Sequence, residues 1–494
     1  MAEQLNNIVR GNKQPQNGAT RYTVVNPADG KTILAEFASS SASDTADAVT
    51  AAREAFVAWK DTPVVKRCRI LFHYKELLEQ RSGQIAEMIV RENGKLLSEA
   101  EGELRRGIEV VEFAAGMPSL MKGDFIEDIA ANVDGYIYRE PLGVVAGACP
   151  FNFPVMIPLW MFPVAIACGN TFVLKPSEKC PLSAAYLVEI ALEAGIPPGV
   201  LNVVHGGRET FEALIDNPDV RAISFVGSTP AAKNVWERAG VAGKRVQSLG
   251  GAKNYIIVMP DADPKETVKA IISSSFGCAG ERCMASSIAL FVGDAQRMLS
   301  DVAAAAKDLT LGNGLDQHSD MGPVISAEHK ARVEHYIAIG EQEGARLLLD
   351  GRGQKAAGLP NGFFIGPTIF SNVAPSMRIA QEEIFGPVLC AMFAPNLDAA
   401  LAIANGSAYG NGASIFTSSG GAARRFRSVI QCGMLGINTG VPAPMAFFSF
   451  GGHKNSFFGD LRAHGPDGVE FYTKKKTVID RWPGSGGTGS IWGK

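Results

Sequence analysis

The sequence lacks the patterns that identify most metal, disulfide-rich or secreted proteins. Its eight cysteines are dispersed over 494 residues without a CxxC pair, and its seven histidines form no ligand-spaced cluster. We therefore expect neither a metal site nor a disulfide framework, and a reducing cytoplasm is the expected compartment. The N-terminus has no basic region followed by an apolar core, so no secretory signal is predicted.

Long apolar runs and a strong net charge are also missing. The longest apolar stretch, residues 149–168, is interrupted by four prolines, which favours buried protein over a membrane span. A formal net charge of −3 gives no electrostatic reason to expect nucleic acid or an anionic membrane as a partner. The balance of 46% hydrophobic and 20% charged residues predicts a globular chain, and its length predicts two or three domains.

Strand and helix patterns alternate along most of the chain. After helical patterns at 41–60 and 65–115, short runs of small and branched residues suit strands that are buried on both faces. These runs are 143–149, 171–174, 201–204 and 222–226. Helical stretches separate them, which predicts a parallel sheet with ligands at the carboxyl ends of its strands. A second such series begins after residue 250, where we place a domain boundary.

Two further segments, 136–140 and 470–473, look like exposed strands that belong to neither series. Edge strands invite pairing with another chain, so both are candidates for an oligomer interface. The glycine- and serine-rich tail, residues 483–494, is expected to be flexible.

Cys283 is the strongest candidate for chemistry, in a segment of small residues beside Arg282. A cysteine thiolate can attack an aldehyde, and the resulting thiohemiacetal becomes a thioester when it loses hydride. An adjacent cation favours ionisation of the thiol. Taken alone, however, Cys283 is more often explained as a buried structural cysteine. Cys278 is best explained as a packing residue.

Polar residues follow several of the predicted strands. Asn152 follows the first strand, where its amide could donate to an oxyanion, although a turn asparagine is an equally good explanation. Lys175 and Glu178 follow the second strand and suit the hydroxyls of a ribose, and taken alone they also suit an ordinary polar loop. Gly227 and Ser228 open a helix whose N–H groups suit a pyrophosphate. The GxGxxG fingerprint is absent.

Further along, Glu383 and Phe385 could contact a ribose and a nicotinamide, or could simply form a solvated helix end. In their order and spacing, these segments together resemble the aldehyde dehydrogenase superfamily from about residue 20 to about residue 482. The resemblance implies an α/β fold with a Rossmann-like NAD-binding domain, an α/β catalytic domain and a β-ribbon oligomerisation element. The implied domains are 1–122 with 142–250 for NAD binding, 251–463 for catalysis, and 123–141 with 464–482 for oligomerisation.

The resemblance also assigns a role to each candidate residue. Cys283 is then the nucleophile and Asn152 the oxyanion donor, while Lys253 shapes the active site. NAD is the implied cofactor, held in a Rossmann variant without the usual fingerprint, and a homotetramer built from dimers is implied. The implied cofactor-binding residues are Phe151, Lys175, Glu178, Gly227, Ser228, Glu383 and Phe385.

Within this superfamily, the chain is most similar to the CoA-acylating methylmalonate-semialdehyde dehydrogenase branch. The similarity lies in segments 150–154, 156–163, 280–285 and 456–460. In that branch, an arginine just before the cysteine and another in an N-terminal helix recognise the substrate carboxylate, which suits the guanidinium fork. Arg282 matches the first and Arg106 best matches the second. A surface arginine is the alternative for Arg106, and Arg105 is easily confused with it.

Most members of the superfamily carry a glutamate where this chain has Leu249, and that glutamate activates water to cleave the thioester. The CoA-acylating branch usually has asparagine and methionine where this chain has Leu249 and Gly250. The missing base predicts slow hydrolysis. The branch implies that malonate or methylmalonate semialdehyde is oxidised by NAD to a thioester on the cysteine and loses its carboxylate as carbon dioxide or bicarbonate. The acyl group then passes to coenzyme A, giving acetyl-CoA or propionyl-CoA.

Two alternatives and several open points accompany this expectation. One alternative is a hydrolytic NAD(P)-dependent dehydrogenase of another small aldehyde, and the other is a structural protein that kept the fold. An intact Cys283 and Asn152 argue against the structural protein, because it needs neither. The loop 438–444 also departs from the branch pattern, so the substrate can differ. The choice of semialdehyde, NAD against NADP, and dimer against tetramer stay open.

Overall fold

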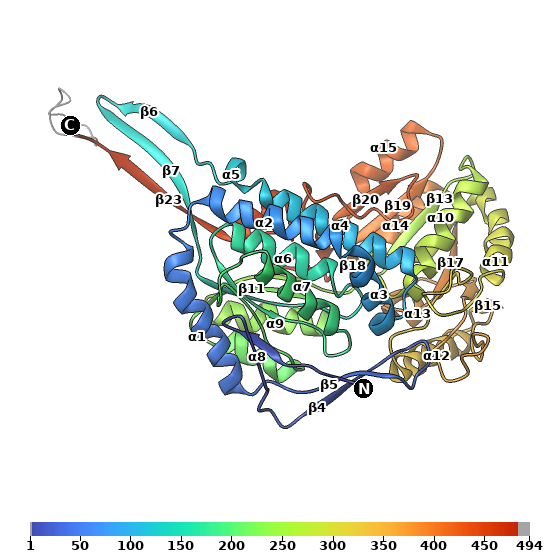
Figure 1. Ribbon diagram of the computed structural model, residues 1–494. Helices are drawn as coiled ribbons and strands as arrows, with labels where there is room; N and C mark the ends of the chain where they lie inside the picture. The colour runs from blue at the N-terminus through green and yellow to red at the C-terminus, as the bar shows by residue number, and fades with distance from the viewer. Residues whose placement is uncertain (1, 483–494) are drawn as a thin grey trace.

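The computed structural model describes residues 2–482, which form two α/β bodies and a projecting ribbon (Figure 1). The first body is built on an eight-stranded sheet whose second to sixth strands run parallel to one another. From edge to edge it consists of β22 (Phe457–Phe458), β12 (Arg245–Leu249), β11 (Val220–Val226), β8 (Val144–Ala148), β9 (Thr171–Lys175), β10 (Leu201–Val203), β2 (Asn7–Val9) and β3 (Asn12–Gln14).

Helices cover both faces of this sheet, because alternate residues of each buried strand point to opposite sides. In β8, Val144 and Ala146 pack with α1 (Ala42–Trp59), α8 (Arg208–Asp216) and α9 (Thr229–Val241). Val145, between them, belongs to the larger core on the other face. That core is formed with α2 (Val64–Gln80), α3 (Ser82–Asn93), α4 (Leu97–Ala115), α6 (Met156–Ala167) and α7 (Leu182–Glu193).

The second body is built on a seven-stranded sheet that is parallel except for its edge strand β15. Its order is β15 (Arg346–Leu349), β16 (Thr368–Ser371), β17 (Val388–Ala394), β14 (Ser286–Val292), β13 (Asn254–Val258), β19 (Gly412–Phe416) and β20 (Met434–Ile437). Its helices are α10 (Pro264–Phe276), α11 (Leu299–Lys307), α12 (Ala327–Gln342), α13 (Arg378–Gln381), α14 (Leu397–Asn405) and α15 (Gly420–Val429). The alternating strands and helices expected in both series are thus present.

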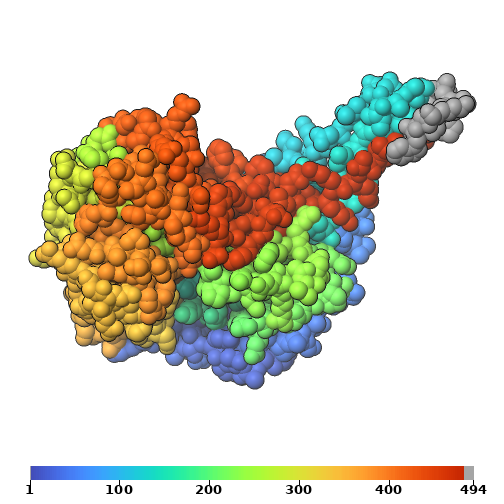
Figure 2. Space-filling view, turned by 180° about the vertical axis from the view of Figure 1, so that it is seen from behind, coloured from blue at the N-terminus to red at the C-terminus, as the bar shows by residue number. Residues whose placement is uncertain are grey.

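A three-stranded antiparallel ribbon of β6 (Phe125–Ala130), β7 (Val133–Pro141) and β23 (Thr473–Asp480) projects from the first body (Figures 1 and 2). The strand expected at 136–140 is part of β7. The strand expected at 470–473 is wrong, because α16 (Gly465–Phe471) includes its first two residues and β23 begins only at Thr473. Phe471 and Tyr472 are buried in the core with α6, and burial of two aromatic rings outweighs their preference for strands.

The remaining elements complete the edges. A separate sheet is formed by β1 (Glu3–Gln4), β5 (Ile33–Ala38) and β4 (Arg21–Val25), and β18 (Tyr409–Gly410) pairs with β21 (His453–Lys454). Short helices α5 (Met117–Leu120), η1 (Gly277–Gly280) and η2 (Gly293–Met298) join longer elements. Among the described residues, no helix is both long and apolar enough to cross a membrane.

The predicted domain boundary at residue 250 lies in the short connection between β12 and β13. One strand crosses it: β22, from the segment predicted to be catalytic, pairs with β12 at the edge of the first sheet. The division into domains stays a prediction. The tail expected to be flexible, 483–494, lies outside the described residues.

Candidate functional site

The candidate residues of the first sheet follow neighbouring parallel strands at the same edge. Ala148 at the end of β8 is level with Lys175 at the end of β9, and with Phe225 near the end of β11. Leu249 at the end of β12 is level with Val226. The loops that continue from these strands therefore meet, as expected for ligand sites in parallel sheets.

Cys283 and Asn152 line the same cavity, whose volume is about 230 Å³. Its wall includes residues from both bodies, since Gly227 and Ser228 lie opposite Glu383 and Phe385. The full lining is Pro150, Phe151, Asn152, Val226, Gly227, Ser228, Gly250, Gly251, Cys283, His329, Arg332, Glu383 and Phe385. The sequence-predicted nucleophile and oxyanion donor are thus brought together at the junction of the two sheets.

The loop that carries Cys283 is held by several backbone contacts. Asn254 and Asn411 donate their side-chain N–H groups to the Cys283 carbonyl at 2.8 and 2.9 Å. Gly280, at a φ of +73°, lies so close to Gly386 that an added Cβ would be 2.2 Å from the Gly386 carbonyl oxygen. A side chain at residue 280 is therefore excluded both by space and by backbone conformation.

Burial, together with the nearby Glu383 carboxyl, raises the pKa of the Cys283 thiol to about 12. Backbone N–H groups of Cys283 and Met284 and the charge of Arg282 act in the opposite direction but are outweighed. Arg282 thus lowers the pKa of the thiol as expected. The effect of burial is larger, however, and in this conformation the thiol is protonated at neutral pH. Burial also raises the pKa of Glu383 to about 7, so this carboxylate can accept a proton near neutrality.

Asn152 is buried, and its side-chain N–H group donates to the Glu281 carbonyl at 3.0 Å. Glu281 lies two residues before Cys283, so the amide is anchored directly to the cysteine loop. An amide N–H and the backbone N–H of Cys283 are the kind of donors that stabilise an oxyanion.

A larger cavity of about 640 Å³ shares Phe151, Gly227 and Ser228 with the small one. Lys175 and Glu178 also line it. The Lys175 ammonium donates to the carbonyls of Pro176 and Gly206 at 2.6 and 2.7 Å, and burial lowers its pKa. The N-terminus of α9 opens here without a side-chain cap, which leaves backbone N–H groups for an anion.

Glu383 and Phe385 lie on the segment between α13 and β17. Glu383 accepts a hydrogen bond from the Ala252 N–H at 2.9 Å, and Gly251 leaves space for its carboxylate, since a Cβ there would be 2.3 Å from Oε2. Lys253, which is buried, donates to the Glu382 carbonyl at 2.9 Å.

Arg106 and Arg282, the two candidates for binding the substrate carboxylate, lie outside the lining of the small cavity. Arg106 is bound to Glu109 at 2.9 Å and contacts the Met445 sulfur, whereas Arg105 lies 3.9 Å from Glu79 on α2. Arg282 donates to the backbone carbonyls of Ser273 and Ser274. Its Nε has no hydrogen-bond partner among residues 2–482.

Leu249 is buried in the core of the first body and is not part of the cavity wall, which Gly250 and Gly251 form instead. Of the cavity-lining residues in the described chain, Glu383 is the one carboxylate. The position at which the resemblance led us to look for a water-activating base is thus occupied by a leucine packed in the core.

Sequence reasoning missed His329 and Arg332, which α12 brings into the small cavity from the second body. His329 Nε2 lies 2.6 Å from the Phe385 carbonyl and 3.3 Å from a Glu281 carboxylate oxygen. Burial lowers the pKa of His329 to about 4 and raises that of Glu281 to about 8. No local motif marks these residues, because only the tertiary fold makes them neighbours.

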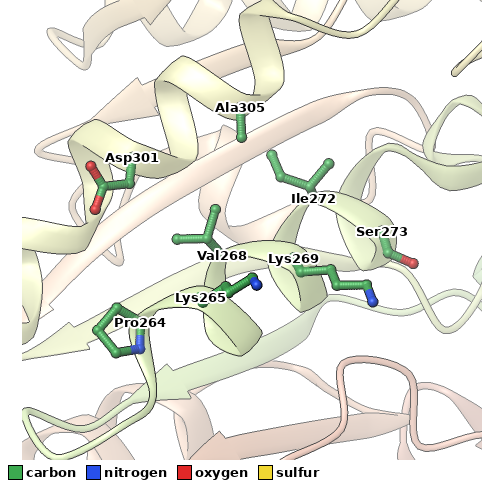
Figure 3. A pocket seen from close by; sticks show the side chains of 8 residues that line it. All are labelled: Pro264, Lys265, Val268, Lys269, Ile272, Ser273, Asp301 and Ala305. Carbon is green, nitrogen blue, oxygen red and sulfur yellow. The ribbon is translucent and has the colours of Figure 1, made fainter.

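A separate groove of about 620 Å³ lies between α10 and α11 (Figure 3). Val268 and Ile272 point from α10 toward α11 in this groove, and Lys265 and Lys269 lie beside them. It contains none of the residues predicted from the sequence and no cysteine. We therefore assign the chemistry to the cavities that Cys283 and Lys175 line.

Comparison with known proteins adds independent information. Residues 14–478 match the aldehyde dehydrogenase family. The malonate-semialdehyde dehydrogenase 1 of Geobacillus kaustophilus is 53% identical over 478 residues, which cover 97% of this chain and 98% of that protein. A malonate-semialdehyde dehydrogenase of Halalkalibacterium halodurans is 51% identical over 481 residues, which cover 97% and 99%.

Solved structures show a similarity to enzymes with related names. The methylmalonate-semialdehyde dehydrogenase of Oceanimonas doudoroffii superposes with a TM-score of 0.96 at 47% identity, covering 98% of this chain and 99% of that one. A Sinorhizobium meliloti protein, provisionally named a methylmalonate-semialdehyde dehydrogenase and crystallised with NAD, also reaches 0.96, at 44% identity with the same coverage.

Proposed function

This chain belongs to the aldehyde dehydrogenase family, and we propose that it oxidises malonate or methylmalonate semialdehyde through a thioester on Cys283. One observation carries the proposal: the thiol and the buried amide of Asn152 meet in a cavity that continues into a larger one beside Lys175. The names of the relatives at about half identity support this substrate class.

We propose NAD as the cofactor, and the larger cavity fits it. The uncapped start of α9, with Ser228, suits a pyrophosphate, and Lys175 and Glu178 suit the adenosine ribose. The Glu178 carboxylate favours NAD over NADP, because a 2′-phosphate would be repelled there. Glu383 would hold the nicotinamide ribose, with Phe151 and Phe385 beside the ring. When bound, NAD accepts the hydride that leaves the substrate carbon.

In the first half-reaction, Cys283 gives up its proton and its sulfur attacks the aldehyde carbon. The Glu383 carboxylate, in the wall of the same cavity, is suited to take this proton. The Asn152 amide and the Cys283 N–H stabilise the negative charge that develops on the aldehyde oxygen. Loss of hydride leaves the acyl group as a thioester on Cys283.

We propose that coenzyme A, as co-substrate, takes the acyl group in the second half-reaction. The reason is Leu249: its buried hydrocarbon cannot activate water, whereas the coenzyme A thiol is itself a good nucleophile. Before transfer, the bond from the substrate carboxylate to its neighbouring carbon breaks, the carboxylate leaves as carbon dioxide or bicarbonate, and a proton from solvent takes its place on that carbon. The coenzyme A thiol then replaces the Cys283 sulfur on the acyl carbon, which restores the free thiol and releases acetyl-CoA or propionyl-CoA.

We propose that Arg106, aided by Arg282, binds the substrate carboxylate. Arg106 is favoured over Arg105 because it contacts Met445, which follows the loop 438–444 at the expected substrate mouth, whereas Arg105 faces Glu79. Arg282 directly precedes Cys283 in the chain, so its guanidinium adds a second positive charge near the reacting end of the substrate. A guanidinium beside this mouth selects an acidic aldehyde over a neutral one.

Assembly and compartment are part of the proposal. The projecting ribbon suits a homotetramer built from dimers, because β6 forms an exposed sheet edge. All eight cysteines are free thiols, which suits a reducing cytoplasm.

The function is tested by following NADH and the carbon product from malonate semialdehyde, with and without coenzyme A. We expect acetyl-CoA when coenzyme A is present, and at least about tenfold slower steady-state turnover without it. The Arg106→Gln variant should raise KM for the semialdehyde about tenfold or more, while Arg105→Gln, its matched control, should leave KM within about twofold. Equal turnover to the free acid without coenzyme A would contradict acyl transfer.

A further inference from the structure

The first three turns of α4 present three charged residues on one face. Glu99, Glu103 and Arg106 are spaced four and three residues apart, and such residues lie on the same side of a helix. Helix α4 packs against α6, the helix that follows Asn152 (Figure 1). Arg106 is the proposed carboxylate-binding residue, but Glu99 and Glu103 have no role in the mechanism described above.

Glu103 forms an ion pair with Lys95 that is almost completely buried, at 1% and 0% side-chain exposure. The Lys95 ammonium lies 2.7 Å from a Glu103 carboxylate oxygen and 2.6 Å from the Asn152 carbonyl oxygen, and it faces the Phe153 ring. Burial lowers the pKa of Lys95, but Glu103 and other nearby groups raise it more, so Lys95 stays charged.

The other oxygen of the Glu103 carboxylate binds the chain just beyond Asn152. It accepts hydrogen bonds from the Val155 and Met156 N–H groups at 2.8 and 3.0 Å, where α6 begins. Lys95 thus holds the carbonyl of Asn152, and Glu103 holds the N–H groups three and four residues further on. Between them they fix both ends of the turn that orients the Asn152 side chain.

Glu99, one turn earlier on α4, holds the cysteine loop. Its carboxylate accepts a hydrogen bond from the Cys278 N–H at 2.6 Å and another from the Leu96 N–H at 3.0 Å. Cys278 and Ala279 have φ values of +49° and +50°, a conformation that ordinary residues adopt only when their surroundings impose it. The contact from Glu99 is one such constraint.

We propose that Lys95, Glu99 and Glu103 are positioning residues that set the oxyanion donor Asn152 at the correct distance from Cys283. The inference rests on the proposed roles of Asn152 and Cys283. A buried ion pair contributes little net stability compared with a well-packed apolar pair, whereas an oxyanion donor that is misplaced by an ångström loses much of its effect. Because α4 also carries Arg106, a single helix holds the residues that bind the substrate carboxylate, position the oxyanion donor and anchor the loop of the nucleophile.

The test uses acylation of Cys283 by 4-nitrophenyl acetate, which needs neither NAD nor coenzyme A. The thiolate attacks the ester carbonyl and 4-nitrophenolate leaves, so a burst of 4-nitrophenolate reports the acylation rate. Lys95→Met, Glu103→Gln and the double variant Lys95→Met/Glu103→Leu are compared, each with and without Asn152→Ala. The double variant removes both buried charges together and should therefore fold even where Lys95→Met alone does not.

We expect each positioning variant to slow acylation about 10- to 100-fold, with Asn152→Ala alone slowing it about 100-fold. In the Asn152→Ala background the same variants should cost less than about threefold, because they act through Asn152. Glu92→Gln is the matched control. Its carboxylate is equally buried but binds Leu182 and Ser183 at the start of α7, so its acylation rate should stay within about twofold of wild type.

Two outcomes separate the inference from the proposed function. If the wild-type protein shows no burst, or if Cys283→Ala still shows one, the assignment of Cys283 fails. If the burst depends on Cys283 but the positioning variants lose the same factor with and without Asn152, their effect is general and the positioning role is overturned. An undiminished burst rate in the folded double variant would overturn it as well.

Discussion

At the scale of single residues, the environment of Cys283 differs from what its neighbours in sequence suggest. Arg282 directs its guanidinium to the carbonyls of Ser273 and Ser274, and enclosure by protein dominates the thiol's pKa. A raised thiol pKa means that the thiolate, which is the reactive form, is scarce at pH 7 and increases with pH. A proton acceptor is then needed for turnover, which Glu383 is placed to provide.

We therefore predict that alkylation of Cys283 by iodoacetamide, in the protein without cofactor, becomes about tenfold faster per pH unit from pH 7 to pH 10 without a plateau. Peptide mass spectrometry measures the rate at each cysteine. Cys432, which is partly exposed and whose thiol pKa is raised to about 11, serves as internal reference. A plateau near pH 7 would show that the Cys283 thiol is ionised there, contrary to this prediction.

At the scale of elements, the residues at the end of β12 explain why no carboxylate at position 249 reaches the site to activate water. Leu249 pairs with Val226 and Phe457 on the neighbouring strands, and its side chain packs into the core of the first body. The next two residues, Gly250 and Gly251, form the cavity wall without side chains. Restoring a carboxylate at residue 249 would thus place a charge in hydrocarbon before it could reach the thioester.

We predict that Leu249→Glu lowers the free energy of unfolding by roughly 3 kcal/mol and leaves the rate of free-acid formation without coenzyme A unchanged. Urea unfolding and product analysis measure the two effects. Leu249→Met, which keeps an apolar side chain of similar volume, should cost less than about 1.5 kcal/mol. Gain of hydrolysis in the glutamate variant would mean that position 249 does reach the acyl group.

Strands and helices were the features that the sequence predicted best. The buried strands at 144–148 and 171–175 were predictable because each is a short apolar run followed by polar residues, and in the sheet their ends, Ala148 and Lys175, are level with each other. Lys95 and His329 were not predictable: each acts on a residue more than 50 positions away, and no local pattern encodes such pairs. The helix at 465–471 was missed because tertiary burial overrode local preference.

At the scale of the whole molecule, the ribbon is the part where a single chain exposes both a strand edge and large apolar side chains. Phe125 and Ile126 on its edge strand β6 are 62% and 63% exposed. An apolar edge strand of this kind favours pairing with another copy of the chain.

We predict that the double variant Phe125→Ser/Ile126→Ser has a lower assembled mass than wild type in analytical ultracentrifugation, while its secondary structure by circular dichroism is unchanged. Val241→Ser, which removes an apolar side chain that is even more exposed, at the end of α9, is the control and should not change the mass. An unchanged mass in the ribbon variant would exclude β6 from the interface.

The pairing of β22 with β12 has a consequence for synthesis of the chain. The first sheet takes its opposite edges from residues 12–14 and 457–458, so β22 is the last strand of this sheet to be synthesised, more than 200 residues after β12. A nascent chain that stops before residue 457 leaves the β12 edge open, with its backbone N–H and C=O groups free to pair with other polypeptides. The cysteine loop and most of the sheet therefore leave the ribosome before the strand that closes this edge, and this interval is when the growing chain is most prone to aggregate.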